Sequence, residues 1–309
     1  MIRENPHYRR EAFVNGLQAA GYKLRSGEPA QDVACDDILV TWNRYGHFEV
    51  AANDFERRGG RVVVAENGYL GANGSTPKFD VAAGDVRPGH YYALALNGHN
   101  GSGAWPSDDG SRWRALGIEL KLWRAEKPGD REIGKSGDRK SDFSISRPPA
   151  LTDFVALPPS RPPALTEDVP DHRHILVCPQ RGIGPNRQAQ HPAWPQDVTA
   201  RLKALTQRPV RVRPHPGLGP GTVPIAQDLE GCWAVVTWAS GAGIHALVAG
   251  VPVFFEAKHW ILADAAERDI KTIESPALPE RLPAFERLAC AQWTVAEIAS
   301  GEAFRRLLT

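Results

Sequence analysis

The sequence has no long apolar run. No stretch approaches the roughly 18 consecutive apolar residues that a helix needs to cross a membrane. The N-terminal residues MIRENPHYRREAF are polar and lack the apolar core of a signal peptide. We therefore expect a cytoplasmic protein without a membrane segment.

Clustered cysteines and an excess of one charge are also missing. The 4 cysteines lie far apart and form no C-x-x-C pair, which favours free thiols in a reducing compartment over a disulfide framework or a zinc site. The formal net charge is +1. No global field then compels binding to a nucleic acid or a membrane, and neither partner is excluded.

Several nucleotide and metal motifs are absent. The pattern G-x-x-x-x-G-K-[ST] does not occur, and no G-x-G-x-x-G follows an apolar run, which disfavours a P-loop ATPase and a Rossmann dehydrogenase. No D-x-D follows a predicted strand. The HRH run at 172–174 is explained by strand alternation. We expect no metal requirement.

The first part of the chain has the pattern of a parallel α/β unit. Apolar residues at helical spacing predict a helix over 8–21. Short β-type runs predict strands over 36–42, 60–68 and 91–96, and a helical segment separates the first two strands.

The periodicity is lost between Lys127 and Asp171. This stretch is charged and rich in glycine and proline, and SRPPALT occurs twice within it, at 146–152 and 160–166. We expect a linker or flexible insertion over 125–171. Because 309 residues exceed the usual size of a single core, we predict two α/β domains, 1–124 and 172–309.

The second part has three apolar strands that each end in a polar or glycine-rich loop. These are HRHILVCPQRGIG (172–184), PVRVRPHPG (209–217) and GCWAVVTWASGAG (231–243), with helices over 196–207 and 244–250 and a further strand over 251–256. In open parallel sheets, ligands bind beyond the carboxyl ends of the strands. The three loops are therefore expected to meet at a ligand.

These loops carry groups suited to phosphate. Backbone N–H groups at a helix N-terminus, arginine forks and histidine all bind anionic oxygens. An ordinary surface turn is the alternative for the Pro-His-Pro-Gly segment. The expected ligand-binding residues are Arg181, Gly182, Gly184, Arg213, His215, Ser240, Gly241 and Gly243.

The run from RPHPG through TWASGAGIHALVAGVPVFFE resembles the donor-binding half of GT-B glycosyltransferases, in the capsule-polysaccharide and bacterial sialyltransferase-like branch. The similarity covers roughly 172–260. It implies two Rossmann-like parallel-sheet domains with a cleft between them. It also implies a nucleotide-sugar donor, with UDP-sugar favoured and no metal, whose phosphates contact His215 and Ser240.

One position departs from that family. Many GT-B enzymes have a glutamate, which binds ribose or sugar hydroxyls, where this chain has His245. His245 is then a further candidate for phosphate binding, and Glu256 is the candidate for the missing carboxylate. The identity of the donor stays open.

A second, looser resemblance covers most of the chain. AENGYLG, GHNGSGAWP, CPQRGIG and TWASGAG, in this order, resemble uncharacterised glycosyltransferase-like proteins of phage genomes. Hypermodification of DNA bases is common in phages. The resemblance implies transfer of a sugar to a 5-hydroxymethylpyrimidine, such as 5-hydroxymethylcytosine, in phage DNA within the host cytoplasm.

Two residues are candidates for the general base. Glu66 ends a VVV strand in ENG, where sialyltransferase-like enzymes carry an acidic-acidic-Gly motif; Asn67 replaces the second acid here. A base must lie within hydrogen-bond reach of the acceptor hydroxyl. His99 in LNGHNGSG is the rival base. A turn-capping role for Glu66 and a solvated loop position for His99 are the structural alternatives.

A basic stretch with interleaved tryptophans suggests a DNA acceptor. A DNA-modifying enzyme needs cations for the phosphates and aromatic rings for an extruded base. The candidates are Arg112, Trp113, Arg114 and Arg124. Acidic residues are mixed through this stretch, so a solvated face is the alternative.

Two other functions remain open for the protein: a capsule-like polysaccharide glycosyltransferase with a CMP- or UDP-sugar donor, and a non-catalytic nucleotide-binding module.

Overall fold

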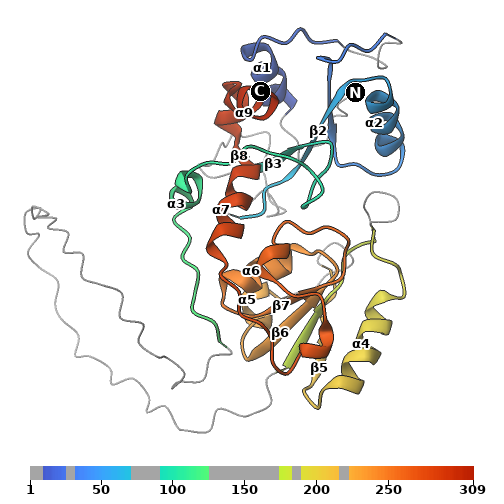
Figure 1. Cartoon of the computed structure of the whole chain (residues 1–309), viewed down its shortest axis with the longest axis vertical. Coiled ribbons are helices and arrows are strands. Elements are labelled where there is room, and N and C mark those ends of the chain that lie inside the picture. The colour runs from blue at the N-terminus through green and yellow to red at the C-terminus, as the bar shows by residue number, and fades with distance from the viewer. Residues whose placement is uncertain (1–9, 26–31, 71–90, 125–173, 183–188, 216–222) are drawn as a thin grey trace, which may run out of the picture. The chain divides into compact units, whose positions relative to one another are not determined.

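Among the residues that it describes, the computed structural model contains two β-sheets and their covering helices (Figure 1). Both sheets belong to one compact unit, Met1–Ala125 together with Arg173–Thr309. The predicted linker over 125–171 lies outside the described residues, as does Gly184. The structure describes residues 10–25, 32–70, 91–124, 174–182, 189–215 and 223–309.

The first sheet is mixed. Its strand order is β1-β2-β3-β8. Strands β1 and β2 are parallel and joined through helix α2, as predicted, whereas β3 is antiparallel to β2 and β8 is antiparallel to β3. The expectation of a wholly parallel first sheet was wrong, because the buried run YYALAL fits a central strand in either direction. The elements are β1 (Ile38–Trp42), α2 (His47–Arg57), β2 (Arg61–Asn67), β3 (Tyr91–Leu96) and β8 (Gln292–Thr294).

The second sheet is parallel throughout, which confirms the α/β pattern predicted for this part of the chain. Its strand order is β5-β4-β6-β7. A helix follows each of β4, β5 and β6 before the next strand begins, because parallel strands must be joined by crossover connections. The elements are β4 (His174–Cys178), α4 (Trp194–Leu205), β5 (Val210–Val212), α5 (Ile225–Asp228), β6 (Cys232–Thr237), α6 (Gly241–Val248) and β7 (Val253–Phe255).

Helices cover both faces of the first sheet. Alternate side chains of a strand point to opposite faces. Val63 and Ala65 therefore pack with α1 (Arg10–Ala19), α8 (Val295–Ala299) and α9 (Glu302–Leu308), and Val62 and Val64 pack against Phe55 of α2. Helix α1 approaches α8 closely, since a Cβ on Gly16 would lie 1.8 Å from the carbonyl oxygen of Ile298.

The second sheet is covered in the same way. On one face, Ile175 and Val177 pack with Val198 and Leu202 of α4. On the other face, Leu176 and Val235 pack in the cluster that contains Ile244 of α6. The short 3-10 helices η3 (Ala263–Ala265) and η4 (Ile270–Thr272) follow β7.

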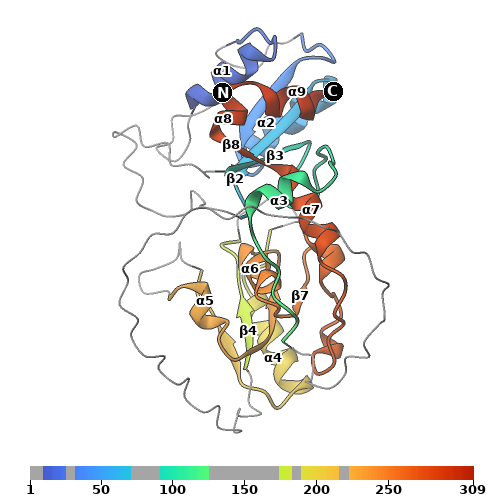
Figure 2. The same ribbon diagram turned by 90° about the vertical axis from the view of Figure 1, so that its left-hand side faces the viewer.

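The C-terminal part of the chain leaves the second sheet and joins the first. Helix α7 (Leu282–Ala291) leads directly into β8, which pairs with β3. Helix α3 (Ser111–Leu116) lies beside α7 (Figures 1 and 2), with the rings of Trp113 and Phe285 5.1 Å apart. The sequence places residues 292–309 in the second predicted domain; in the structure they supply β8 to the first sheet and the helices α8 and α9 that pack on it. No helix in the described part of the chain is long and apolar enough to cross a bilayer.

Candidate functional site

The second sheet has a topological switch point between β4 and β6. The chain runs from β4 to β5 on one side and returns to β6 on the other side. Ligands of such sheets bind at this point, beyond the carboxyl ends of the strands. Thr237, the last residue of β6, bonds to the end of β4: its Oγ1 donates to the carbonyl of Cys178 at 2.9 Å. The same Oγ1 accepts from the N–H of Ser240 at 3.0 Å.

Helix α6 begins at this edge with Ser240 as its N-cap. The Ser240 side chain accepts from the N–H of Ala242 at 3.3 Å. Because the hydroxyl acts here as an acceptor, its own proton can still be donated to a ligand oxygen. The positive end of the helix dipole lies at the same place. The arrangement suits an anion.

Gly241, the first residue of α6, has no reason in the fold to be glycine. A Cβ there would find no atom within 4 Å, and its φ is not positive. Every other glycine that the described residues include either has a positive φ or would bring a Cβ within 3.0 Å of another atom. Glycine costs about 0.5–1 kcal/mol relative to alanine in the middle of a helix, and nothing in the described surroundings favours it at this first position. Close approach of a ligand to the backbone explains its presence.

Three basic residues lie at the ends of β4 and β5. Arg181 is exposed, and Arg213 forms an ion pair with Asp228 and donates to the carbonyl of Val223 at 2.8 Å. Burial lowers the pKa of His215, and the positive charges of Arg181 and Arg213 lower it further. The structure therefore brings these predicted ligand-binding residues together. A bound phosphate would raise the pKa of His215, because a nearby negative charge favours the protonated ring.

The loop that carries Arg181 is held by a glutamine that the sequence did not single out. The buried side chain of Gln190 accepts from the N–H of Gln180 at 2.6 Å, in the way that a neighbouring strand would. Gly182 follows with a φ of 70°. No local pattern marks Gln190, because its partner Gln180 lies 10 positions earlier in the sequence.

His245 and Glu256, the two remaining residues predicted to bind the donor, lie in α6 and directly after β7. His245 lies in α6, and burial lowers its pKa. The Glu256 carboxylate accepts from Trp194 Nε1 at 2.7 Å and from Arg201 at 2.7 and 2.8 Å. The Glu256 oxygens are thus bonded to α4 rather than presented to a ligand in this state.

Glu66 and His99, which were predicted as rival bases, lie next to each other. Glu66 is the last residue but one of β2, and His99 lies in the loop that follows β3. His99 Nε2 is 3.7 Å from Glu66 Oε1. Within the described residues, the buried His99 Nδ1 has no hydrogen-bond partner. Carboxylate and imidazole side chains are both able to act as general bases, so the two candidates occupy one place in the structure.

The loop that carries His99 also reaches the second sheet. Asn100 Nδ2 donates to the carbonyl of Ala239 at 3.2 Å, one residue before Ser240. Gly101 has a φ of 93°, and a Cβ there would lie 2.5 Å from the carbonyl carbon of Trp260. The contacts of this loop therefore connect the Glu66–His99 pair to the amino end of α6.

Tyr69 is a site residue that the sequence did not indicate. Its hydroxyl accepts from the N–H of Asn100 at 3.2 Å. Burial raises the pKa of Tyr69, and the charge of Glu66 raises it further against the lowering effect of the Asn100 hydrogen bond. The phenol therefore stays protonated near neutral pH.

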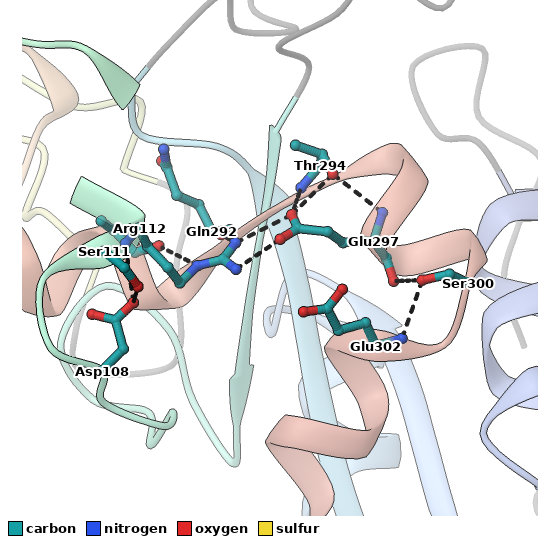
Figure 3. Close-up of polar contacts among 9 residues, drawn as sticks. Asp108, Ser111, Arg112, Gln292, Thr294, Glu297, Ser300 and Glu302 are labelled. Atoms are coloured by element: carbon teal, nitrogen blue, oxygen red, sulfur yellow. Dashed lines mark hydrogen bonds and ion pairs between the residues drawn. The ribbon is translucent and has the colours of Figure 1, made fainter. Parts of the chain in front are cut away.

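Arg112, expected to bind an acceptor, lies in a network of the chain's own polar groups (Figure 3). It donates to the Glu297 carboxylate at 2.7 and 3.2 Å and to the carbonyl of Gln292 at 2.6 Å. Its guanidinium lies 4.1 Å from the centre of the Trp293 ring. These contacts join α3 to β8 and α8.

The other expected acceptor-binding residues are not gathered beside Arg112 on one exposed face. Trp113 is buried against Phe285. Arg124 donates to the carbonyls of Ala249 and Leu229, at 3.1 and 2.6 Å. Arg114 alone of the four is exposed. The sequence pattern showed basic residues and aromatic rings. It did not show that most of these side chains are buried or hydrogen-bonded to other parts of the chain.

Thiols and metal ligands are dispersed. All 4 cysteines are free, and burial raises the pKa of Cys178 and Cys232 to about 12, so these two thiols stay protonated at neutral pH. Among the residues described, no group of 3 or more His, Cys, Asp or Glu side chains is placed to hold a metal ion.

Comparison with known protein families finds no family model that matches this chain. No curated protein shows significant sequence similarity to it either. Its function is therefore inferred from the chemistry and geometry of its residues.

Proposed function

We propose that the protein is a glycosyltransferase that moves a sugar from a nucleotide-sugar donor to a hydroxyl acceptor. The donor's phosphates would bind at the amino end of α6, beyond the carboxyl ends of β4 and β6. The observation that carries this proposal is Gly241, an exposed helical glycine that neither φ nor packing explains. A phosphate close to the N–H groups of the first turn would require the absence of a side chain there.

Three further groups support a diphosphate. The Ser240 hydroxyl can donate to one phosphate oxygen, and Arg181 supplies an exposed charge. His215, held toward its neutral form by burial and neighbouring arginines, would gain a proton beside a phosphate. The parallel second sheet fits the donor half of a GT-B enzyme. The mixed first sheet departs from the wholly parallel sheet that the resemblance implies.

Glu66 is the proposed general base. The acceptor oxygen would bond to the anomeric carbon while the bond from that carbon to the donor phosphate breaks. The hydroxyl proton would pass to the Glu66 carboxylate, beside His99, and the nucleoside diphosphate would leave with the electron pair. Its charge would be stabilised at α6.

The proposed acceptor is a 5-hydroxymethylpyrimidine in DNA, a proposal carried by the resemblance to phage proteins. Arg112 and Arg124 bond to the chain's own groups and do not add to it. A capsule-like glycan is the alternative acceptor. A salt titration of acceptor binding separates them, because each phosphate contact contributes about one unit of slope in log affinity against log salt.

The test is a donor and acceptor panel. The protein is incubated with UDP-, GDP- and CMP-sugars and hydroxymethylated DNA, and the DNA is then digested to nucleosides for mass measurement. We expect a nucleoside heavier by one sugar residue with one of the donors. Nucleotide binding without transfer to DNA or to glycan acceptors would favour a non-catalytic binding module. No binding of any nucleotide sugar would contradict the proposal.

A further inference from the structure

Asn100 makes two hydrogen bonds to different parts of the molecule. Its backbone N–H donates to the Tyr69 hydroxyl at 3.2 Å, beside the strand end that carries Glu66. Its side-chain Nδ2 donates to the carbonyl of Ala239 at 3.2 Å, next to the N-cap of α6. His99 precedes it directly in the chain.

The backbone of Asn100 favours this residue type. Its φ is 49°, in the left-handed region that asparagine and glycine tolerate better than other residues. Glycine would adopt the backbone but would lack the amide. Aspartate would keep the size but place a carboxylate against a carbonyl oxygen. Asparagine meets both requirements.

The Tyr69 contact is itself held in place. The fully buried Gln292 accepts from the N–H of Tyr69 at 2.9 Å. The phenol therefore presents its hydroxyl to Asn100 from a fixed backbone. A connected set of hydrogen bonds runs from β8 through Tyr69 and Asn100 to the peptide before Ser240.

We propose that Asn100 is a positioning residue that fixes the Glu66–His99 pair relative to the amino end of α6. This inference rests on the proposed function of those two places. Transfer of a group requires the base and the leaving group to be held in register, and a misplacement of about 1 Å can cost about 10²-fold in rate. Asn100 acts through its neighbours and does not itself react.

The test compares Asn100→Asp with Asn97→Asp. Both residues lie in the same loop with left-handed backbones, at φ 49° and 63°, and both changes add one negative charge. Only the first removes the donor to Ala239. In Asn100→Asp, amide hydrogen exchange over 238–243 should become faster, by up to about tenfold for one lost hydrogen bond. It should be unchanged in Asn97→Asp.

The catalytic readout uses the donor that shows transfer in the wild-type protein. Asn100→Asp should lower kcat by about 10²-fold with little change in the KM for the donor. Asn97→Asp should match wild type. Asn100→Gly keeps the backbone conformation and should behave as Asn100→Asp does, which guards against an effect of the new charge.

The outcomes distinguish the positioning role of Asn100 from the proposed function of the protein. Unchanged exchange over 238–243 in both Asn100 variants would overturn the positioning role, whatever the activity. Faster exchange with wild-type kcat in a transferring enzyme would overturn it as well. Absence of transfer by the wild-type protein with every donor would instead contradict the proposed function, and the exchange data would still decide whether Asn100 holds the amino end of α6.

Discussion

The side-chain amide of Gln292 pairs with the backbone of Leu70 in both directions. Nε2 donates to the Leu70 carbonyl at 3.1 Å, and Oε1 accepts from the Leu70 N–H at 3.1 Å. The two residues are 222 positions apart, and the Gln292 side chain is fully buried. The last strand thereby supplies hydrogen bonds to the loop that follows Glu66.

Replacing Gln292 by methionine should destabilise the protein. The apolar side chain would leave the N–H groups of Tyr69 and Leu70 without their acceptor, at about 1–3 kcal/mol for each unsatisfied group. Urea unfolding gives the free energy directly. Gln227→Met, at an exposed position of α5, is the control and should change it by less than about 0.5 kcal/mol. Equal effects of the two changes would contradict the role of Gln292.

Arg112→Met should lower stability rather than act on DNA binding alone. The Arg112 and Glu297 side chains are only 13% and 24% exposed, and removing one partner of such a pair leaves a partly buried charge, at a cost of about 1–3 kcal/mol. Arg114→Met, at a side chain that is 62% exposed, is the control and should be nearly neutral. Weakened DNA binding with unchanged stability in Arg112→Met would instead support direct contact with the acceptor.

The same pair predicts a loss of stability in acid. Burial raises the pKa of Glu297, but hydrogen bonds from Arg112 and Thr294 outweigh it and hold the pKa below the ordinary value. A carboxylate with a lowered native pKa stabilises the fold above its unfolded pKa, near 4.3, and that stabilisation is lost as the pH falls through the native value. In Arg112→Met this part of the acid dependence should shrink.

Three histidines predict a second pH range in which the stability of the fold changes. Burial is the first cause of the lowered pKa of His174, His215 and His245. An unfolded histidine binds a proton near pH 6.5 while the native one does not, so stability should fall as the pH drops below about 6.5. Thermal unfolding between pH 7.5 and 5 measures it. His245→Gln should reduce the slope, and an identical slope would contradict the effect of burial at His245.

The sequence predicted the second sheet better than the first. The runs ending in CPQRGIG and WASGAG carry both their burial pattern and their terminating loops within a few residues, so β4, β6 and α6 could be placed from local signals. Strand β8 has only Gln292–Thr294, and nothing local marks it as a partner of β3. Its pairing depends on contacts formed across the whole chain.

The candidate site was predictable in the same limited way. Glu66 and His99 were each found from a strand end, but their contact, at 3.7 Å, depends on how the loop after β3 folds back. Tyr69 and Asn100 were missed because they act through a hydroxyl and an amide placed by tertiary structure. The partner of Arg112, Glu297, lies 185 residues away, so the local sequence did not show that this arginine is paired. Arg112 was therefore predicted to contact an acceptor.

Glu66→Gln should separate catalysis from binding. The change keeps the shape of the side chain but removes the proton acceptor, so kcat should fall by about 10²–10⁴-fold. Affinity for the nucleotide sugar should change little. Glu119→Gln, at an exposed position, is the matched control. A wild-type rate in Glu66→Gln would assign the base to another group, with His99 the first to examine.

Gly241→Ala tests most directly whether α6 binds the donor phosphates. The first turn has room for the added methyl group, and a helical alanine is more stable than glycine by about 0.5–1 kcal/mol, so the free energy of unfolding should stay equal or rise. If a phosphate lies against this backbone, calorimetric affinity for the nucleotide sugar should fall by at least about tenfold, the equivalent of one lost hydrogen bond to a charged group. Unchanged affinity in the folded variant would contradict donor binding at this helix.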